Sequence, residues 1–241
     1  MTDNTSLIKD IFSENGLSDL LNAQRLQKLS ILIENMLETN EKFNLTSITD
    51  RTEIVVKHIA DSATVIKHIP KNAKLLDVGT GAGFPSLPIA ILRDDVKVYA
   101  LDSTAKKLKY IDDTAKLLEL DNIKTVSGRA EELGKNVNYR ERFDVVTARA
   151  VAALNVLTEL CVPFVKIGGI FLSMKGANAH EEIDLAKSGV IQLGGSKFED
   201  LSLNLHYNGI EFDRHLVISK KIKKTADNFP RMYSRISKKP L

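Results

Sequence analysis

From residue 73 onward, short runs rich in β-branched and aliphatic residues alternate with longer amphipathic stretches. Such alternation is typical of a parallel sheet whose connecting helices cover both faces. The β-rich runs are KLLDVG, VKVYALD, IKTVSG, FDVVTAR and GGIFLSMKG. The helices that we expect between and after them span residues 85–93, 104–120, 151–165 and 178–188. The alternation therefore predicts an α/β fold of the doubly wound, Rossmann-like class.

The end of the chain has a different pattern. Two alternating runs, SLNLHYN and RHLVISKKI, are joined by GIEFD and predict a β-hairpin. The sheet would then have seven strands, mostly parallel, and would end in an antiparallel pair.

The first 70 residues are predicted to be a helical extension. Ser18 is a suitable N-cap for a helix with an apolar stripe at three- and four-residue spacing. The stripe consists of Leu26, Leu29, Ile33, Met36 and Leu37. We therefore expect an N-terminal helical extension (residues 1–70), an α/β domain (71–220) and a basic C-terminal arm (221–241).

A glycine-rich stretch, DVGTGAGFP, follows the first predicted strand and opens the first helix. Ligands of doubly wound sheets bind at this position, beyond the carboxyl ends of the strands. A dinucleotide fingerprint would need a further glycine where Phe84 stands, so Gly79 and Gly81 indicate a nucleoside whose charged part is not a pyrophosphate. S-adenosylmethionine fits, because its carboxylate can accept N–H groups at a helix start. Asp77 is a candidate partner for its ammonium, directly or through water.

Two further stretches extend this site. Asp102 ends the second strand, where an acid can accept hydrogen bonds from ribose hydroxyls, although it could instead cap the next helix. Ala130 and Glu131 follow the third strand, where they could line the adenine.

The fourth strand continues as FDVVTARAVAAL and limits the choice of methyl acceptor. It has no Asn/Asp-Pro-Pro-aromatic tetrad for an exocyclic amine and no Pro-Cys for attack on a pyrimidine. Guanine N7 needs neither, because its lone pair is available without a general base. Arg149 could contact the cofactor or pair with guanine, or it could be a surface arginine bound to a carboxylate. We predict no catalytic side chain and no metal ligand.

Composition restricts the remaining possibilities. The chain has 241 residues, a formal net charge of +3 and one cysteine, Cys161, which lies in an apolar run and is expected to be structural. No secretion signal and no membrane span are evident, so we expect a cytoplasmic monomer. Residues 214–241 contain nine Lys/Arg and one acid, which indicates a phosphate-contacting arm or a solvated tail.

Seven short motifs together resemble the RsmG family, also called glucose-inhibited division protein B. The motifs are NLTSI (44–48), HIADS (58–62), DVGTGAGFPSLP (77–88), LDS (101–103), RAEE (129–132), ARA (148–150) and a terminal KKPL. The resemblance implies a class I S-adenosylmethionine-dependent guanine-N7 methyltransferase of 16S, the small-subunit ribosomal RNA. It also implies that the cofactor is contacted by Gly79, Phe84, Ala130, Glu131 and Arg149.

The resemblance further implies that NLTSI and HIADS form a helical cover over the site. Their polar residues Asn44, Thr46, His58 and Asp61 could orient substrate or make only local hydrogen bonds. RMYSRIS departs from the Gly/Pro-rich segment that several relatives have before KKPL, so the contacts of the tail are not carried over. Two alternatives stay open: a methyltransferase of a protein or small molecule, and a non-catalytic S-adenosylmethionine-binding module.

Overall fold

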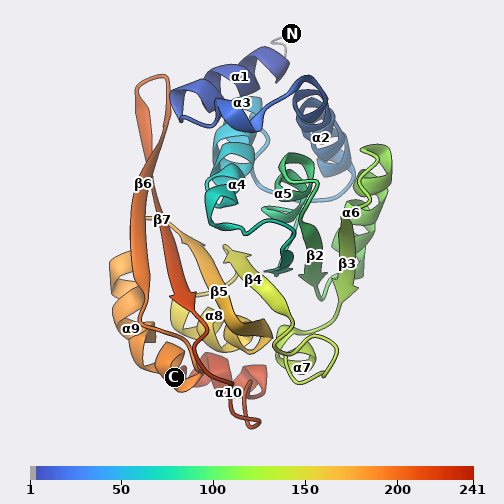
Figure 1. Cartoon of the computed structure of the whole chain (residues 1–241). Helices are drawn as coiled ribbons and strands as arrows, with labels where there is room; N and C mark the ends of the chain where they lie inside the picture. The colour runs from blue at the N-terminus through green and yellow to red at the C-terminus, as the bar shows by residue number, and fades with distance from the viewer. Residues whose placement is uncertain (1–3) are drawn as a thin grey trace.

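Seven strands form one sheet in the order β3-β2-β1-β4-β5-β7-β6 (Figure 1). The computed structural model describes residues 4–241. Strands β1 to β5 are parallel, and β7 pairs antiparallel with both β5 and β6. The strands are β1 (Lys74–Val78), β2 (Lys97–Asp102), β3 (Ile123–Ser127), β4 (Phe143–Arg149), β5 (Val165–Lys175), β6 (Glu199–Tyr207) and β7 (Ile210–Lys220). The predicted mostly parallel seven-stranded sheet with a terminal hairpin is confirmed.

The hairpin turn is shorter than predicted. GIEFD does not connect the strands, because Tyr207 pairs with Ile210 and only Asn208 and Gly209 lie between them. Both turn residues have positive φ, +51° and +74°. A two-residue hairpin needs this backbone, which Asn-Gly adopts readily, so the following residues extend β7 instead.

The connecting helices lie where the alternation predicts them, with shifted ends. They are α5 (Ser86–Leu92), α6 (Ala105–Leu117), α7 (Ala130–Leu133), α8 (Leu154–Cys161) and α9 (Ala179–Gln192). The largest shift follows α8, which we expected to run to residue 165. It ends at Cys161 and continues as a 3₁₀ turn, η4 (Val162–Phe164). Pro163 lacks an N–H for an α-helical hydrogen bond, which accounts for the early end.

The N-terminal extension is helical, apart from residues 1–3, which lie outside the described residues. Its longest helix is capped by Asn22, whose side chain accepts a hydrogen bond from the Arg25 N–H at 2.8 Å. The prediction that Ser18 is this cap was wrong, because Ser18 begins a separate 3₁₀ turn. The predicted apolar stripe is buried, with Leu37 half-buried. The elements are α1 (Asn4–Glu14), η1 (Ser18–Leu20), α2 (Ala23–Lys42), α3 (Arg51–Ile54), η2 (Val55–Ala60), α4 (Asp61–Ala63) and η3 (Ile66–His68).

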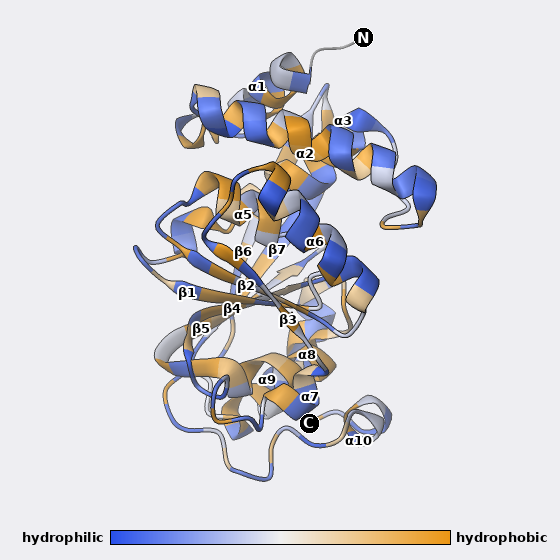
Figure 2. Cartoon of the chain, turned by 90° about the vertical axis from the view of Figure 1, so that its right-hand side faces the viewer, coloured by the Kyte–Doolittle hydropathy of each residue, from blue (hydrophilic) through white to orange (hydrophobic). Residues whose placement is uncertain are grey.

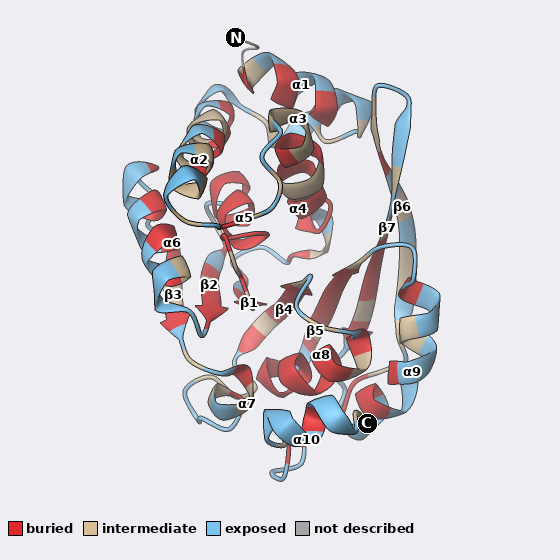
Figure 3. Cartoon of the chain, turned by 180° about the vertical axis from the view of Figure 1, so that it is seen from behind, coloured by how far each residue is buried: buried red, intermediate tan, exposed pale blue. Residues whose placement is uncertain are grey.

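Two apolar cores lie on opposite faces of the sheet. The N-terminal helices pack with α5 and α6 on one face, while α7, α8 and α9 cover the other, and the buried residues follow these two layers (Figures 2 and 3). The outer end of the hairpin also holds α1, because the Asn15 side chain exchanges two hydrogen bonds with the His206 backbone at 2.7 and 2.8 Å. None of the helices within residues 4–241 is long and apolar enough to cross a bilayer.

The basic C-terminal segment is docked against the second face. Lys221 is 1% exposed, and its ammonium donates to the Val162 carbonyl at 2.9 Å and the Thr225 hydroxyl at 2.6 Å. Burial lowers the Lys221 pKa to about 8. Arg231 binds the buried carboxylate of Glu159, and Ile236 of α10 (Tyr233–Lys238) is fully buried. Part of the positive charge therefore stabilises the fold instead of facing solvent.

Candidate cofactor-binding site

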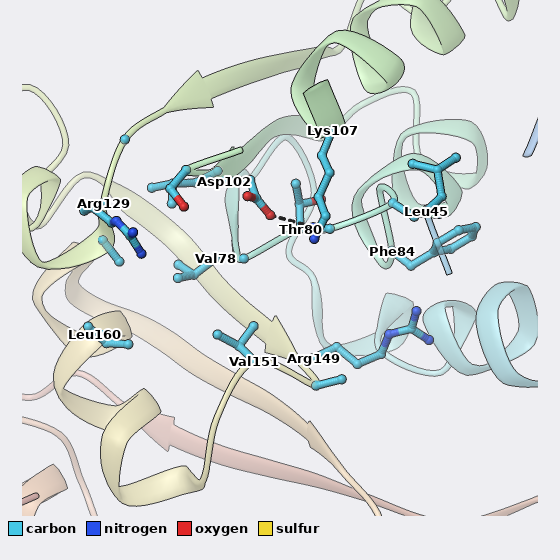
Figure 4. Close-up of a pocket in the computed structure, with 18 of the residues that line it drawn as sticks. Leu45, Val78, Thr80, Phe84, Asp102, Lys107, Arg129, Arg149, Val151 and Leu160 are labelled. Atoms are coloured by element: carbon cyan, nitrogen blue, oxygen red, sulfur yellow. Dashed lines mark hydrogen bonds between the residues drawn. The ribbon is translucent and has the colours of Figure 1, made fainter. Parts of the chain in front are cut away.

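A cavity of about 390 Å³ lies at the carboxyl edge of the parallel strands, beside the switch point between β1 and β4 (Figure 4). Doubly wound sheets bind ligands at this point. The lining includes seven of the residues that we predicted to contact a cofactor, and Asp77 is the exception. The seven are Gly79, Gly81, Phe84, Asp102, Ala130, Glu131 and Arg149. The fold therefore brings these residues to one site from four separate strand ends, and their contact with a ligand stays a prediction.

The loop after β1 exposes its backbone to this cavity. Gly79 and Gly81 have φ of +72° and +60°, which L-residues rarely adopt. A β-carbon on Gly79 would lie 2.5 Å from the Val151 side chain, whereas a β-carbon on Gly81 would have no neighbouring atom nearer than 3.9 Å. Gly79 is thus needed for packing within the protein, and Gly81 leaves open space for a ligand.

Asp102 holds this loop in place as well as facing the cavity. Its two carboxylate oxygens accept hydrogen bonds from the Gly81 N–H at 3.1 Å and the Thr104 N–H at 2.8 Å. The helix-start alternative is therefore correct in part, because Thr104 precedes α6. Each oxygen keeps a second lone pair for a ribose hydroxyl.

Asp77 lies beneath the loop and does not line the cavity. It is fully buried, and neither carboxylate oxygen has a hydrogen-bond partner among the described residues. Burial raises the Asp77 pKa to about 6, although the nearby Thr80 and Ser86 hydroxyls oppose this shift. The suggested direct contact with the ammonium of a ligand is not available in this conformation.

Arg149 joins β4 to the N-terminal extension. Its guanidinium donates to the Lys57 carbonyl at 2.7 Å and to the Asp61 carboxylate at 2.9 Å, and contacts His58 Nδ1 at 3.1 Å. The second Asp61 oxygen accepts from Arg214 at 3.0 Å. Arg149 is bound to a carboxylate, as one alternative expected, but its side chain is only 14% exposed and lines the cavity.

The predicted cover also contributes directly to the cavity wall. The His58 ring stacks on Phe84 with 4.7 Å between ring centroids, and its Nε2 lies 3.2 Å from the Thr46 hydroxyl. His58 belongs to a π-helical turn, a feature that recurs at functional sites. Asn44 is exposed and is absent from the lining.

A second cavity of about 670 Å³ adjoins the first. The two share His58, Arg149, Ala150 and Val151 in their walls. Three further cationic side chains line the second cavity, and they come from η2, β5 and β7. They are Lys57, Lys175 and Arg214.

Sequence reasoning missed several lining residues. Val151 belongs to both cavities, Lys107 lies one helical turn into α6, and Tyr233 comes from α10 near the end of the chain. Lys107 could have been inferred from its spacing to Asp102. No local signal identifies Tyr233, because only the docking of the C-terminal segment brings it to the cavity.

The buried carboxyl of Asp77 makes stability depend on pH. The folded-state pKa of Asp77, about 6, exceeds the ordinary value of 3.8. The contribution of Asp77 to the free energy of unfolding is therefore fully present below pH ~4 and is lost as pH rises through about 6. The loss corresponds to about 3 kcal/mol. Asp77→Asn should therefore raise the free energy of unfolding at pH 7.5 and leave it nearly unchanged at pH 4, as urea titrations without ligand would show. Asp121→Asn, on the surface, is the control, and parallel wild-type and Asp77→Asn profiles would contradict the assignment.

Curated relatives cover nearly the whole chain. The GidB family model, described as rRNA small subunit methyltransferase G, matches residues 25–216. Proteins named ribosomal RNA small subunit methyltransferase G from Clostridium tetani and Lactobacillus helveticus are 43% and 42% identical. The first alignment covers 85% of each chain, and the second covers 92% of this chain and 93% of the relative.

Solved structures share the fold at low sequence identity. TYW2 of M. jannaschii, solved in complex with AdoMet, is 16% identical with a TM-score of 0.51, and the match covers 68% of this chain and 76% of that one. The YcgJ protein of Bacillus subtilis is 14% identical with a TM-score of 0.52, covering 69% of this chain and 100% of that one. The strand order and these likenesses identify a class I methyltransferase fold, and the cofactor is S-adenosylmethionine. The chain belongs to the GidB family, the rRNA small subunit methyltransferases G.

Proposed function

We propose that the protein transfers a methyl group from S-adenosylmethionine to N7 of a guanine in 16S, the small-subunit ribosomal RNA. The observation that carries the proposal is the junction of the two cavities at Arg149 and Val151. One cavity suits the cofactor, and the other would receive the target nucleotide. A cytoplasmic location and a monomeric state remain predictions.

The residues of the first cavity fit S-adenosylmethionine. Asp102 keeps free lone pairs for the ribose, and Ala130 and Glu131 line the same end for the adenine. Gly81 presents backbone to open space. Arg149 also lines the second cavity, and its guanidinium carbon lies 5.6 Å from the centroid of the Phe84 ring. When bound, the cofactor supplies an electrophilic methyl group, and the protein's task is to orient donor and acceptor.

The charges of the second cavity favour a nucleotide over a neutral small molecule. Lys57 and Arg214 could neutralise phosphates of an RNA strand beside it. Its two acids are occupied: Asp61 binds both Arg149 and Arg214, and Glu182 binds Lys175 at 2.7 Å. The lining of the cavity therefore has four cationic side chains against two carboxylates, which gives it a net positive charge.

Among residues 4–241, the junction has no side chain placed to act as a general base. His58 faces Arg149 through one ring nitrogen and Thr46 through the other, so neither nitrogen is free to take a proton. Burial, followed by the Arg149 charge, lowers the His58 pKa to about 3. Guanine N7 needs no deprotonation before attack, so such a junction suits it.

Asp102 tests the placement of the cofactor. Asp102→Ala loses charge-assisted hydrogen bonds to the ribose and also releases the Gly81 N–H. Calorimetry should show affinity for S-adenosylhomocysteine lowered roughly 10- to 150-fold. Thr104→Pro removes the N–H that donates to the other carboxylate oxygen of Asp102 and leaves the Gly81 N–H in place, so it is the control for effects on the start of α6. A loss below twofold in Asp102→Ala would favour a purely structural role.

The chemistry can be tested by mapping the product. N7-methylguanosine is open to reductive strand scission, so its position in ribosomal RNA can be located after reaction with the purified protein. The single-turnover rate should be nearly flat between pH ~6.5 and ~8.5, since no base is deprotonated there. Cys161 is fully buried with a raised pKa, so Cys161→Ser should retain methyl transfer apart from any stability cost. Methyl groups on an exocyclic amine or a pyrimidine carbon would contradict the proposal.

The C-terminal cations test contact with RNA. Truncation at residue 231 is a poor test, because it removes Arg231 from buried Glu159 and Tyr233 from the cofactor cavity. The exposed residues Arg235, Lys238 and Lys239 can instead be changed to Gln together. Affinity for 16S ribosomal RNA should fall. The slope of log affinity against log salt concentration should become less steep by up to about three. Cofactor affinity should stay within twofold.

The matched control neutralises three exposed lysines at the opposite edge of the sheet. These are Lys71, Lys97 and Lys124, which lie at the amino ends of the first three strands. Their change to Gln should leave RNA affinity and its salt slope nearly unchanged. Equal effects of the two triple variants would reduce the C-terminal segment to a structural element.

A further inference from the structure

The direction of one hydrogen-bond chain follows from valence alone. Arg149 Nη2 lies 3.1 Å from His58 Nδ1. A guanidinium has donors only, so the imidazole Nδ1 must accept this bond. A neutral imidazole then carries its single proton on Nε2, which lies 3.2 Å from the Thr46 hydroxyl oxygen. His58 therefore donates to Thr46, and the tautomer is set by the arginine.

The environment of His58 keeps the ring neutral and in place. Its pKa of about 3 lies far below physiological pH, mainly because the ring is buried and secondly because Arg149 is charged. Asp61 faces Arg149 and not the ring, and Lys57 adds further positive charge nearby. The ring also stacks on Phe84 at an interplanar angle of 21°.

The Thr46 hydroxyl has one hydrogen-bonding capacity left, which is the donation of its proton. Its oxygen accepts from His58 Nε2 and from the Ile48 N–H at 3.1 Å, which uses both lone pairs. No acceptor for the proton is found among residues 4–241, and Thr46 is half-buried in the wall of the cofactor cavity. The hydroxyl is therefore available to donate a hydrogen bond to an acceptor in that cavity.

The anchoring of Arg149 fixes the donor-to-acceptor direction of the hydrogen bonds that run from Arg149 through His58 to Thr46. Its other contacts, to the Lys57 carbonyl and the Asp61 carboxylate, hold the guanidinium from two sides. Arg214, from β7, holds the second oxygen of Asp61 at 3.0 Å. Three segments distant in sequence thus fix the orientation of one hydroxyl group.

We propose that Thr46 binds the carboxylate of the cofactor's methionine moiety, as a hydrogen-bond donor oriented by His58 and Arg149. The proposed placement puts the adenosine beside Asp102 and Ala130, and Phe84 lies away from Asp102 across the cavity (Figure 4). Thr46 lies near Phe84, because both contact the His58 ring. The cofactor has three charged groups at that end. The sulfonium and the ammonium are cations and cannot accept a hydrogen bond from the Thr46 hydroxyl, whereas the carboxylate can. This inference rests on the cofactor placement proposed above and not on the identity of the methyl acceptor.

The test compares two ligands that differ only in this carboxylate. Calorimetry measures binding of S-adenosylmethionine and of decarboxylated S-adenosylmethionine to the full-length protein. Thr46→Val should weaken S-adenosylmethionine roughly 10-fold or more, in line with a hydrogen bond to a charged group, and leave the decarboxylated ligand within twofold. Thr46→Ser, which keeps the hydroxyl, should restore most of the affinity.

The positioning role of His58 has its own variant. His58→Phe keeps an aromatic ring against Phe84 but removes the donor to Thr46, so the discrimination between the two ligands should fall partway toward that of Thr46→Val. Equal losses for both ligands in Thr46→Val, or no loss for either, would overturn the proposal. If Asp102→Ala also leaves cofactor affinity unchanged, the proposed cofactor placement is wrong. If Asp102→Ala lowers cofactor affinity as predicted, only the role of Thr46 is wrong.

Discussion

The ion pair between Arg149 and Asp61 is the interaction on which the site depends. The two side chains are 14% and 7% exposed, and Asp61 is bound a second time by Arg214. Removing one partner of a buried pair leaves an uncompensated charge, which typically costs 3–5 kcal/mol. This pair therefore ties the N-terminal extension to β4 and to the hairpin at the place where both cavities meet. The cover over the site cannot move independently of the sheet without breaking it.

The same pair explains why the site is short of reactive groups. The carboxylates and the imidazole near the junction are committed to fixed partners, so they orient neighbouring groups instead of exchanging protons. This arrangement matches a reaction in which the acceptor lone pair is already available and the protein contributes alignment. The residues of NLTSI and HIADS would then act by orienting neighbouring groups through hydrogen bonds. Conservative substitutions that change one hydrogen bond at a time would test this role better than deletions.

The C-terminal segment combines two roles that the sequence does not separate. Lys221 and Arg231 bind buried acceptors, whereas Arg235, Lys238 and Lys239 are exposed. The exposed cations lie on or beside α10, whose Tyr233 reaches the cofactor cavity. Contact with RNA at this helix would therefore occur close to the cofactor cavity, on a segment that is docked against the sheet and not on a free tail.

The sequence by itself determined the α/β alternation, the terminal hairpin, the glycine loop and the acid after the second strand. These features depend on local periodicity and on residues a few positions apart, so they can be read without the fold. The seven motifs that resemble the family added Phe84 as a contact, and they supported Arg149 and the residues after β3, which strand position alone indicates only weakly.

Tertiary structure decided the rest. Asn-Gly shortened the hairpin turn, Asn22 and not Ser18 capped α2, and Asp102 proved to brace Gly81. The contact between Arg149 and His58 joins residues 91 positions apart, and Tyr233 reaches the cavity only because the C-terminal segment docks against the sheet. Such contacts are set by how the layers pack against the sheet, and no local pattern of residues encodes their geometry.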